Sequence, residues 1–215
     1  MNGGRGAGNG TLLVIAKAPV PGRVKTRLTP VYSPREAAAL AEAALRDTLD
    51  AVLAAPARRR VLVLDGEPGA WLPPGIDVVP QCGGGLDARL AAAFGLCDGP
   101  ALLIGMDTPQ VSAELLACGL QLAPGEAVLG PADDGGFWAL GLAEPDGRLV
   151  RGVPMSTPDT GAVQRQRLLR AGLAVRGLPL LRDVDTPDDA RAVAAAAPHT
   201  RFADALAATT GAGAR

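Results

Sequence analysis

Short apolar runs alternate along this chain with segments of helical periodicity, and this alternation limits the folds open to it. The runs begin with Thr11–Ala16 and recur at Val61–Leu64, Ala101–Ile104 and Ala127–Leu129. Strands that alternate with helical segments are typical of βαβ units, whose strands lie parallel in one sheet. The chain is therefore predicted to have an α/β fold with a mostly parallel sheet.

Helix-start signals lie between the apolar runs. Ser33–Glu36 reads Ser-Pro-Arg-Glu, which combines a capping box with a proline in the first turn. Thr157-Pro158 has the same order of cap and proline. Thr186 precedes a proline and two aspartates, which suit the positive end of a helix. We expect a helix to start at each of these three points.

The expected organisation is a single domain. A chain of 215 residues, 48% of them apolar, can bury a full core. Residues 11–208 are assigned to that domain, residues 1–10 to a disordered leader and residues 209–215 to a flexible tail. The leader lacks the apolar core of a signal peptide, and no run approaches the ~20 apolar residues that span a bilayer, so a cytoplasmic location is expected. Cys97 and Cys118 are expected to be small core residues.

Four cations closely follow the first apolar run: Lys17, Arg23, Lys25 and Arg27. They lie in a loop stiffened by proline and glycine, Gly22 among them, at the expected carboxyl end of a strand. Open α/β sheets bind ligands at this edge, and such loops commonly cradle phosphate. The loop is therefore predicted to be a phosphate site, with a solvated basic loop as the alternative.

Three aspartates form a second group of candidates. Asp107 follows a buried run within Gly105–Pro109, Asp134 follows a later strand, and Asp185 precedes the last long helix. A charge at the end of a buried strand needs water, a partner or a metal. Magnesium takes one or two carboxylates together with phosphate oxygens. We expect Asp107 to touch the ligand or the metal, whereas Asp185 could instead support its helix cap.

Glycine clusters supply a third element. Gly83–Gly85 and Gly135-Gly136 can adopt positive φ and approach a ligand closely, although turns explain most of the 28 glycines in the chain. The second cluster falls within Pro131–Trp138, beside an acid and two aromatic residues. Trp138 could stack on an acceptor or pack in the core, and the core is favoured.

Composition argues against several other functions. The chain has 21 basic and 22 acidic residues, so the basic excess of a nucleic-acid or anionic-membrane partner is missing. Aromatic residues make up 3% of the chain, which leaves little for a base-stacking platform. His199 is the single histidine, which weakens any mechanism of the Ser-His-Asp or Cys-His kind.

Four motifs together resemble a known superfamily: Ala16–Leu28, Gly105–Pro109, Gly130–Phe137 and Asp183–Asp189. They resemble the bacterial transferases of the nucleotide-diphospho-sugar superfamily, often assigned to a glycosyltransferase family. That resemblance implies a three-layer, Rossmann-like sandwich, the glycosyltransferase type A fold, with residues 11–208 as one nucleotide-binding domain. The start of the chain is also similar to phospholactate guanylyltransferase and, more distantly, to the molybdopterin nucleotidylyltransferases.

The resemblance implies a role for each matching residue. Lys17, Lys25 and Arg27 correspond to residues that hold the nucleotide phosphates. Asp107 corresponds to a metal-binding acid, and Asp134 to the acid of a Pro-Ala-x-Asp-Gly-Gly segment. The predicted nucleotide-binding set is completed by Gly22, Arg23, Gly84, Gly85 and Gly105.

Asp185 corresponds to a C-terminal acid that can complete a metal site, so Mg²⁺ or Mn²⁺ is expected on Asp107 and Asp185. Two segments depart from the family. Gly84–Asp87 reads Gly-Gly-Leu-Asp where relatives usually have Gly-Asp-Leu-Gly, and Met155–Thr157 stands where they tend to have Trp-Ser-Thr. These departures leave the acceptor open.

The expected reaction is nucleotidyl transfer, in which an acceptor phosphate or phosphonate attacks the α-phosphorus of a nucleoside triphosphate and pyrophosphate leaves. Lys25 and Arg27 are expected to neutralise pyrophosphate, while the metal on Asp107 bridges the phosphates. In the alternative, the chain is a glycosyltransferase that uses a nucleotide sugar as donor, and Asp134 deprotonates the hydroxyl of the acceptor. A catalytically silent nucleotide-binding protein is a second alternative. The expected partners are therefore a nucleotide and a small acceptor, and an oligomer is left open.

Overall fold

The computed structural model describes residues 10–29 and 31–212. Most of the predicted leader, residues 1–10, lies outside these ranges, as does the end of the predicted tail, residues 209–215. The final helix, α6, covers Arg201–Ala212 and so passes the predicted domain end at residue 208. None of the described helices is both long and apolar enough to cross a membrane.

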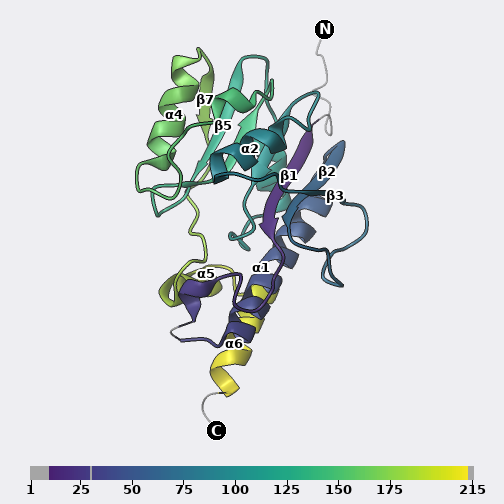
Figure 1. Cartoon of the computed structure of the whole chain (residues 1–215), viewed down its shortest axis with the longest axis vertical. Helices are drawn as coiled ribbons and strands as arrows, with labels where there is room; N and C mark the ends of the chain where they lie inside the picture. The colour runs from purple at the N-terminus through teal and green to yellow at the C-terminus, as the bar shows by residue number, and fades with distance from the viewer. Residues whose placement is uncertain (1–9, 30, 213–215) are drawn as a thin grey trace.

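Seven strands form one sheet in the order β3-β2-β1-β4-β6-β5-β7 (Figure 1). Six of these strands run in the same direction, and β6 lies antiparallel to its neighbours β4 and β5. The predicted α/β fold with a mostly parallel sheet is therefore confirmed. The strands are β1 Thr11–Lys17, β2 Arg59–Asp65, β3 Asp77–Pro80, β4 Ala101–Ile104, β5 Glu126–Pro131, β6 Phe137–Leu142 and β7 Ala174–Gly177.

Helices connect the strands, and two of them begin at the helix starts predicted at Ser33 and Thr186, each of which forms a capping box. The side chains of Ser33 and Thr186 accept the backbone N–H of Glu36 and Asp189, whose carboxylates accept a backbone N–H in return. Short 3-10 helices, η1 and η2, cover Thr26–Leu28 and Gly147–Leu149. The α-helices before α6 are α1 Pro34–Ala54, α2 Leu86–Phe94, α3 Ala113–Gly119, α4 Thr160–Arg170 and α5 Pro187–Ala196.

Two local predictions are wrong. Thr157 does not cap α4, which begins at Thr160; instead, the backbone N–H of Thr157 donates to the Thr160 hydroxyl, 3.1 Å away, in the turn before the helix. Cys118 is not a core residue, because it lies on an exposed position of α3, where its sulfur is 3.5 Å from the Arg176 guanidinium. Cys97 is half-buried.

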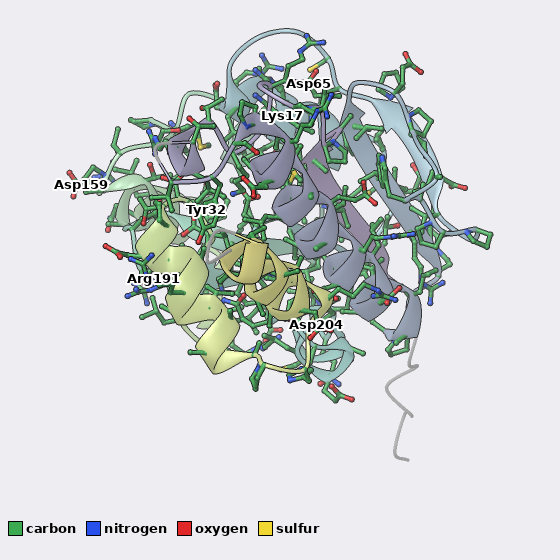
Figure 2. All side chains as sticks on the ribbon, turned by 90° about the horizontal axis from the view of Figure 1, so that it is seen from below. Lys17, Tyr32, Asp65, Asp159, Arg191 and Asp204 are labelled. Carbon is green, nitrogen blue, oxygen red and sulfur yellow. The ribbon has the colours of Figure 1, made fainter. Side chains whose placement is uncertain are left out.

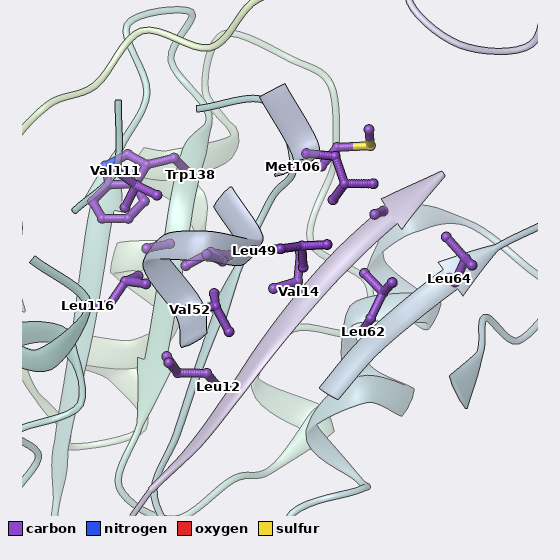
Figure 3. Packing of buried hydrophobic residues seen from close by; sticks show 14 of the residues in the cluster. Leu12, Val14, Leu49, Val52, Leu62, Leu64, Met106, Val111, Leu116 and Trp138 are labelled. Carbon is purple, nitrogen blue, oxygen red and sulfur yellow. The ribbon is translucent and has the colours of Figure 1, made fainter. Parts of the chain in front are cut away.

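Helices cover both faces of the sheet, which gives the predicted three layers. Because side chains alternate along a strand, Leu12 and Val14 of β1 pack on one face and Leu13 on the other. The first face is covered by α1 and α3, and Leu49 of α1 lies beside Val14 in the close view (Figure 3). The second face is covered by α2, η2 and α4, with Phe94 fully buried.

The C-terminal helices form an additional layer outside α1. In Figure 2, α6 crosses over α1, and their contact buries Leu40, Phe202 and Leu206 in a separate apolar cluster. Asp47 of α1 fixes the start of α6, because its carboxylate accepts the backbone N–H groups of Arg201 and Phe202 at 3.1 and 2.9 Å. The start of α6 is thus anchored to α1.

Replacement of Phe202 by alanine is expected to destabilise the whole domain. Phe202 is 0% exposed, so the variant loses its buried surface and leaves a cavity, at a cost of about 3–5 kcal/mol. Urea denaturation measures this loss. Leu180→Ala is the control because Leu180 is 61% exposed; equal losses for the two variants would show that α6 does not share the core.

Candidate functional site

The predicted site residues lie along one edge of the sheet. Because six strands run in the same direction, their carboxyl ends meet at this edge. The basic loop follows β1, Asp107 follows β4, and Asp134 follows β5. Lys17 and Asp65 occupy paired positions at the ends of β1 and β2, and Figure 2 shows both at this edge. Open α/β sheets bind their ligands here.

The segment Leu181–Asp185 crosses this edge and brings a further acid to it. Its backbone is fixed on two sides, because Leu181 O accepts the N–H of Asp133 at 3.1 Å and the N–H of Val184 donates to Asp107 O at 2.8 Å. These bonds tie the crossing segment to the loops that carry Asp134 and Asp107. Residues from three distant parts of the chain therefore meet at one place.

Asp107, Asp134 and Asp183 form an acid cluster. Burial raises the pKa of the Asp183 carboxyl to about 6, and the negative charges of Asp134 and Asp107 act in the same direction. The positive charge of Lys25 opposes them. Asp183 therefore lies within electrostatic range of Asp134, Lys25 and Asp107, and a strongly perturbed acid beside charged partners is typical of a functional site.

Lys25 is buried among these acids. Its side chain is 7% exposed, and its Nζ lies 2.7 Å from Asp107 Oδ1 and donates to the carbonyl of Val184. The contact with Asp107 is an ion pair without the geometry of a good hydrogen bond, so the buried Oδ1 receives no well-directed donor. The Asp107 side chain as a whole is 40% exposed.

Asp134 is held by the glycines that follow it. Its Oδ1 accepts the backbone N–H of Gly136 at 2.7 Å. Gly135 has φ +89°, and a Cβ built there would lie 1.9 Å from the carbonyl oxygen of Pro158. A side chain at this position would therefore displace the loop before α4. The Gly-Gly pair fixes the acid by close backbone packing.

Asp185 forms an ion pair with the basic loop. Its Oδ2 lies 2.5 Å from Nη1 of Arg27, whose side chain is 73% exposed. Asp183, which the sequence analysis did not select, is the acid of this segment that interacts with Asp107 and Asp134. The two aspartates flank Val184, and their spacing gave no signal of which one faces the cluster. The role of Asp185 as a metal ligand stays a prediction.

The glycine-rich loop Gly83–Gly85 is held at the site edge by Gln81, a residue that no sequence motif singled out. The amide of Gln81 donates to Ala16 O at 2.7 Å and to Val63 O at 3.1 Å, which joins the ends of β1 and β2. Gly84 has φ +103°, and its carbonyl accepts from Arg89 Nε at 3.0 Å. The loop therefore has a fixed position beside the basic loop.

Several other predicted residues have clear positions. Gly105 continues β4, with its N–H 3.1 Å from Trp138 O, and Trp138 is buried in the core as favoured. Gly22 has φ +78°, and both it and Arg23 are exposed in the basic loop. Asp87, in the segment that departs from the family pattern, accepts the backbone N–H of Gly152 at 2.8 Å, which lowers the pKa of Asp87 and ties α2 to the segment after η2.

Arg182 connects the loops that carry the acids through two contacts. Its Nε lies 2.5 Å from Asp133 Oδ2, and its carbonyl oxygen accepts from the Gln110 amide at 2.6 Å. Asp133, Gln110 and Arg182 each lie close in sequence to an acid of the cluster. The ion pair of Asp133 with Arg182 therefore joins two of the three loops.

The fold and this site define the class of the protein. The structure is similar to a Desulfovibrio desulfuricans G20 protein assigned to the nucleotide-diphospho-sugar transferases, with a TM-score of 0.74, 28% identity and 82% of each chain covered. It also shares its fold with Rv0371c of Mycobacterium tuberculosis H37Rv in complex with manganese, at a TM-score of 0.56 and 24% identity, over 87% of this chain and 98% of that one. The chain has the nucleotide-diphospho-sugar transferase fold.

The family follows from the sequence comparisons. The model of family DUF2064, described as an uncharacterized protein conserved in bacteria, matches residues 39–157, which include Asp107 and Asp134. A phosphoenolpyruvate guanylyltransferase of Streptosporangium roseum is 35% identical over 199 residues, 86% of this chain and 85% of that protein. The chain belongs to the DUF2064 family and is a transferase.

Asp183→Asn is expected to stabilise the metal-free protein at neutral pH. The folded-state pKa is raised from 3.8 to about 6, so the ionised carboxylate destabilises the fold above pH 6. Wild-type stability should therefore fall as the pH rises from 4 through 6, and the amide variant should not show this fall. Thermal unfolding in EDTA measures the difference, at about 2–4 °C per kcal/mol for a chain of this length.

Asp98→Asn is the control for this measurement, because Asp98 is exposed and precedes the amino end of β4, whereas Asp107 follows the carboxyl end of that strand. The two variants should differ at pH 7.5 and converge with the wild type near pH 4. A lower melting temperature for Asp183→Asn at pH 7.5 would contradict the placement of Asp183 among the acids.

Proposed function

We propose that the chain is a metal-dependent nucleotidylyltransferase that joins a nucleoside triphosphate to a small phosphorylated or phosphonate acceptor and releases pyrophosphate. The observation that carries this proposal is the acid cluster of Asp107, Asp134 and Asp183, which lies beside a loop of four cations at the ligand-binding edge of the sheet. The similarity to a phosphoenolpyruvate guanylyltransferase supports GTP as the donor and phosphoenolpyruvate as the first acceptor to test.

The acid cluster suits Mg²⁺ or Mn²⁺, which prefer carboxylate oxygens. Asp107 Oδ1 is buried without a well-directed donor, and Asp183, whose pKa responds to the charge of Asp107, is a candidate for a second ligand. Within residues 10–29 and 31–212, no group of three or more acidic, histidine or cysteine side chains is arranged to hold a metal by itself. Magnesium typically takes one or two carboxylates and completes its shell with phosphate oxygens and water; when bound, the metal would supply charge neutralisation and orient the phosphates.

The basic loop would bind the triphosphate by charge and by hydrogen bonds. Lys17, Arg23 and Arg27 are exposed at the site edge. The guanidinium of Arg27 has five donors, so its contact with Asp185 leaves others for phosphate oxygens. An acceptor phosphate is already ionised at neutral pH, so nucleotidyl transfer requires no general base. The chain would act mainly by positioning and electrostatic stabilisation.

A glycosyltransferase is the second candidate, and it is favoured by the similarity to the Desulfovibrio protein. In this reaction Asp134 would act as the base toward an acceptor hydroxyl. Its Oδ1 accepts the backbone N–H of Gly136 at 2.7 Å, which fixes the orientation of the carboxylate. The two reactions differ in their donor, which is a nucleoside triphosphate in one and a nucleotide sugar in the other. A catalytically silent nucleotide-binding protein would bind a nucleotide without turnover.

The first test compares nucleoside triphosphates with nucleotide sugars. GTP with Mg²⁺ or Mn²⁺ should raise the melting temperature, and EDTA should remove the effect; saturation at about 100 times Kd corresponds to ~2.7 kcal/mol. Pyrophosphate should be released from GTP only in the presence of phosphoenolpyruvate or another phosphorylated acceptor. Asp107→Asn should lower this rate at least about 100-fold without loss of fold. Stabilisation by a nucleotide sugar alone would favour glycosyl transfer.

The basic loop is tested by Arg27→Ala. A charge-assisted hydrogen bond contributes about 1.5–3 kcal/mol, so loss of a direct phosphate contact should raise the KM for the triphosphate about tenfold or more. Steady-state kinetics measure this change. Arg148→Ala is the matched control, because Arg148 is 91% exposed and pairs with Asp146 beside η2. A KM that changes equally little in both variants would remove Arg27 from the phosphate site.

A further inference from the structure

Lys25 holds the position of a cation within the acid cluster. Its ammonium lies 2.7 Å from Asp107 Oδ1 and also contacts the carbonyl oxygen of Val184. The side chain is 7% exposed, whereas Arg27 in the same loop is 73% exposed. Lys25 therefore differs from a phosphate-binding lysine that is exposed to solvent. Its ammonium supplies positive charge next to the carboxylate of Asp107.

The backbone of Lys25 supports this interpretation. Its φ of 50° and ψ of 40° lie in the left-handed region, which a residue with a side chain adopts at a cost of strain. Such a conformation persists when surrounding contacts hold it. The contacts that hold it are those with Asp107 and Val184, which aim the ammonium inward from the loop. This geometry indicates a defined role for the inward orientation.

One oxygen cannot serve two cations equally well. A divalent ion that bound Asp107 Oδ1 would face the Lys25 ammonium across a short distance in a partly buried site, where charge repulsion is strong. Triphosphate oxygens offer the ammonium a new anionic partner. The three exposed cations of the loop, Lys17, Arg23 and Arg27, can hold those phosphates next to it.

We propose that Lys25 is an internal substitute for the divalent cation. It neutralises Asp107 in the nucleotide-free enzyme and competes with free metal, so that the metal enters together with the triphosphate, which draws the ammonium away from Asp107. This inference rests on the proposed function, since it requires that metal and nucleotide share the site. It assigns to Lys25 a second role besides phosphate binding, that of keeping the free enzyme from binding metal on its own.

The test measures Mn²⁺ binding to the nucleotide-free protein by electron paramagnetic resonance titration. Lys25→Met keeps an unbranched side chain that tolerates the same backbone, but it removes the charge. We expect it to bind Mn²⁺ at least about tenfold more tightly than the wild type. Lys17→Met is the matched control, because it removes the same charge from an exposed position of the loop and should change the affinity much less. Adding Asp107→Asn to Lys25→Met should abolish the gain.

Lys25→Gln serves as a second neutral variant, since its amide can still donate to the Val184 carbonyl and should preserve the fold if the methionine variant does not. Unchanged or weaker Mn²⁺ binding in the folded neutral variant would overturn the inference, as would an equal gain in Lys17→Met. Stabilisation of the wild type by GTP and Mn²⁺ together is measured in parallel. If that stabilisation persists while the neutral variants show no gain, the inference fails and the proposed function stands. If it is missing, the proposed function itself fails.

Discussion

The hydrogen bond between the N–H of Val184 and the carbonyl of Asp107 joins two segments that are far apart in the sequence. It places the crossing segment Leu181–Asp185 over the carboxyl edge of the sheet. This bond holds the backbone next to Asp183 against the loop that carries Asp107. Lys25 reinforces the same junction, because it contacts both the Asp107 carboxylate and the Val184 carbonyl. The site thus depends on how the chain returns to its own sheet.

The junction concentrates negative charge, which opposes folding. Asp183 is half-buried, and burial together with the charges of Asp134 and Asp107 raises its pKa to about 6. A core of apolar residues on both faces of the sheet supplies the stability that offsets it. Strained elements lie at the same edge, including the left-handed backbone of Lys25. Such local costs are typical of functional sites, where geometry is maintained by the surrounding structure.

Much of the fold followed from local patterns, whereas the site followed only in part. Apolar runs and the caps at Ser33 and Thr186 predicted the strands and two helix starts, because these signals depend on neighbouring residues. The helix start predicted at Thr157 was wrong because a threonine followed by proline also occurs in turns, and here it forms the turn before α4. The choice between Asp183 and Asp185, and the pairing of Lys25 with Asp107, depend on tertiary contacts over long sequence separations. No local pattern records them.

The late position of the crossing segment also affects how the enzyme is made. A chain that emerges from the ribosome amino end first exposes β1, the basic loop and Asp107 long before Leu181–Asp185 and the helix α6, which packs on α1. The acid cluster is therefore completed only after all seven strands have emerged. A nascent chain can hold a nearly complete sheet and still lack a site for its nucleotide.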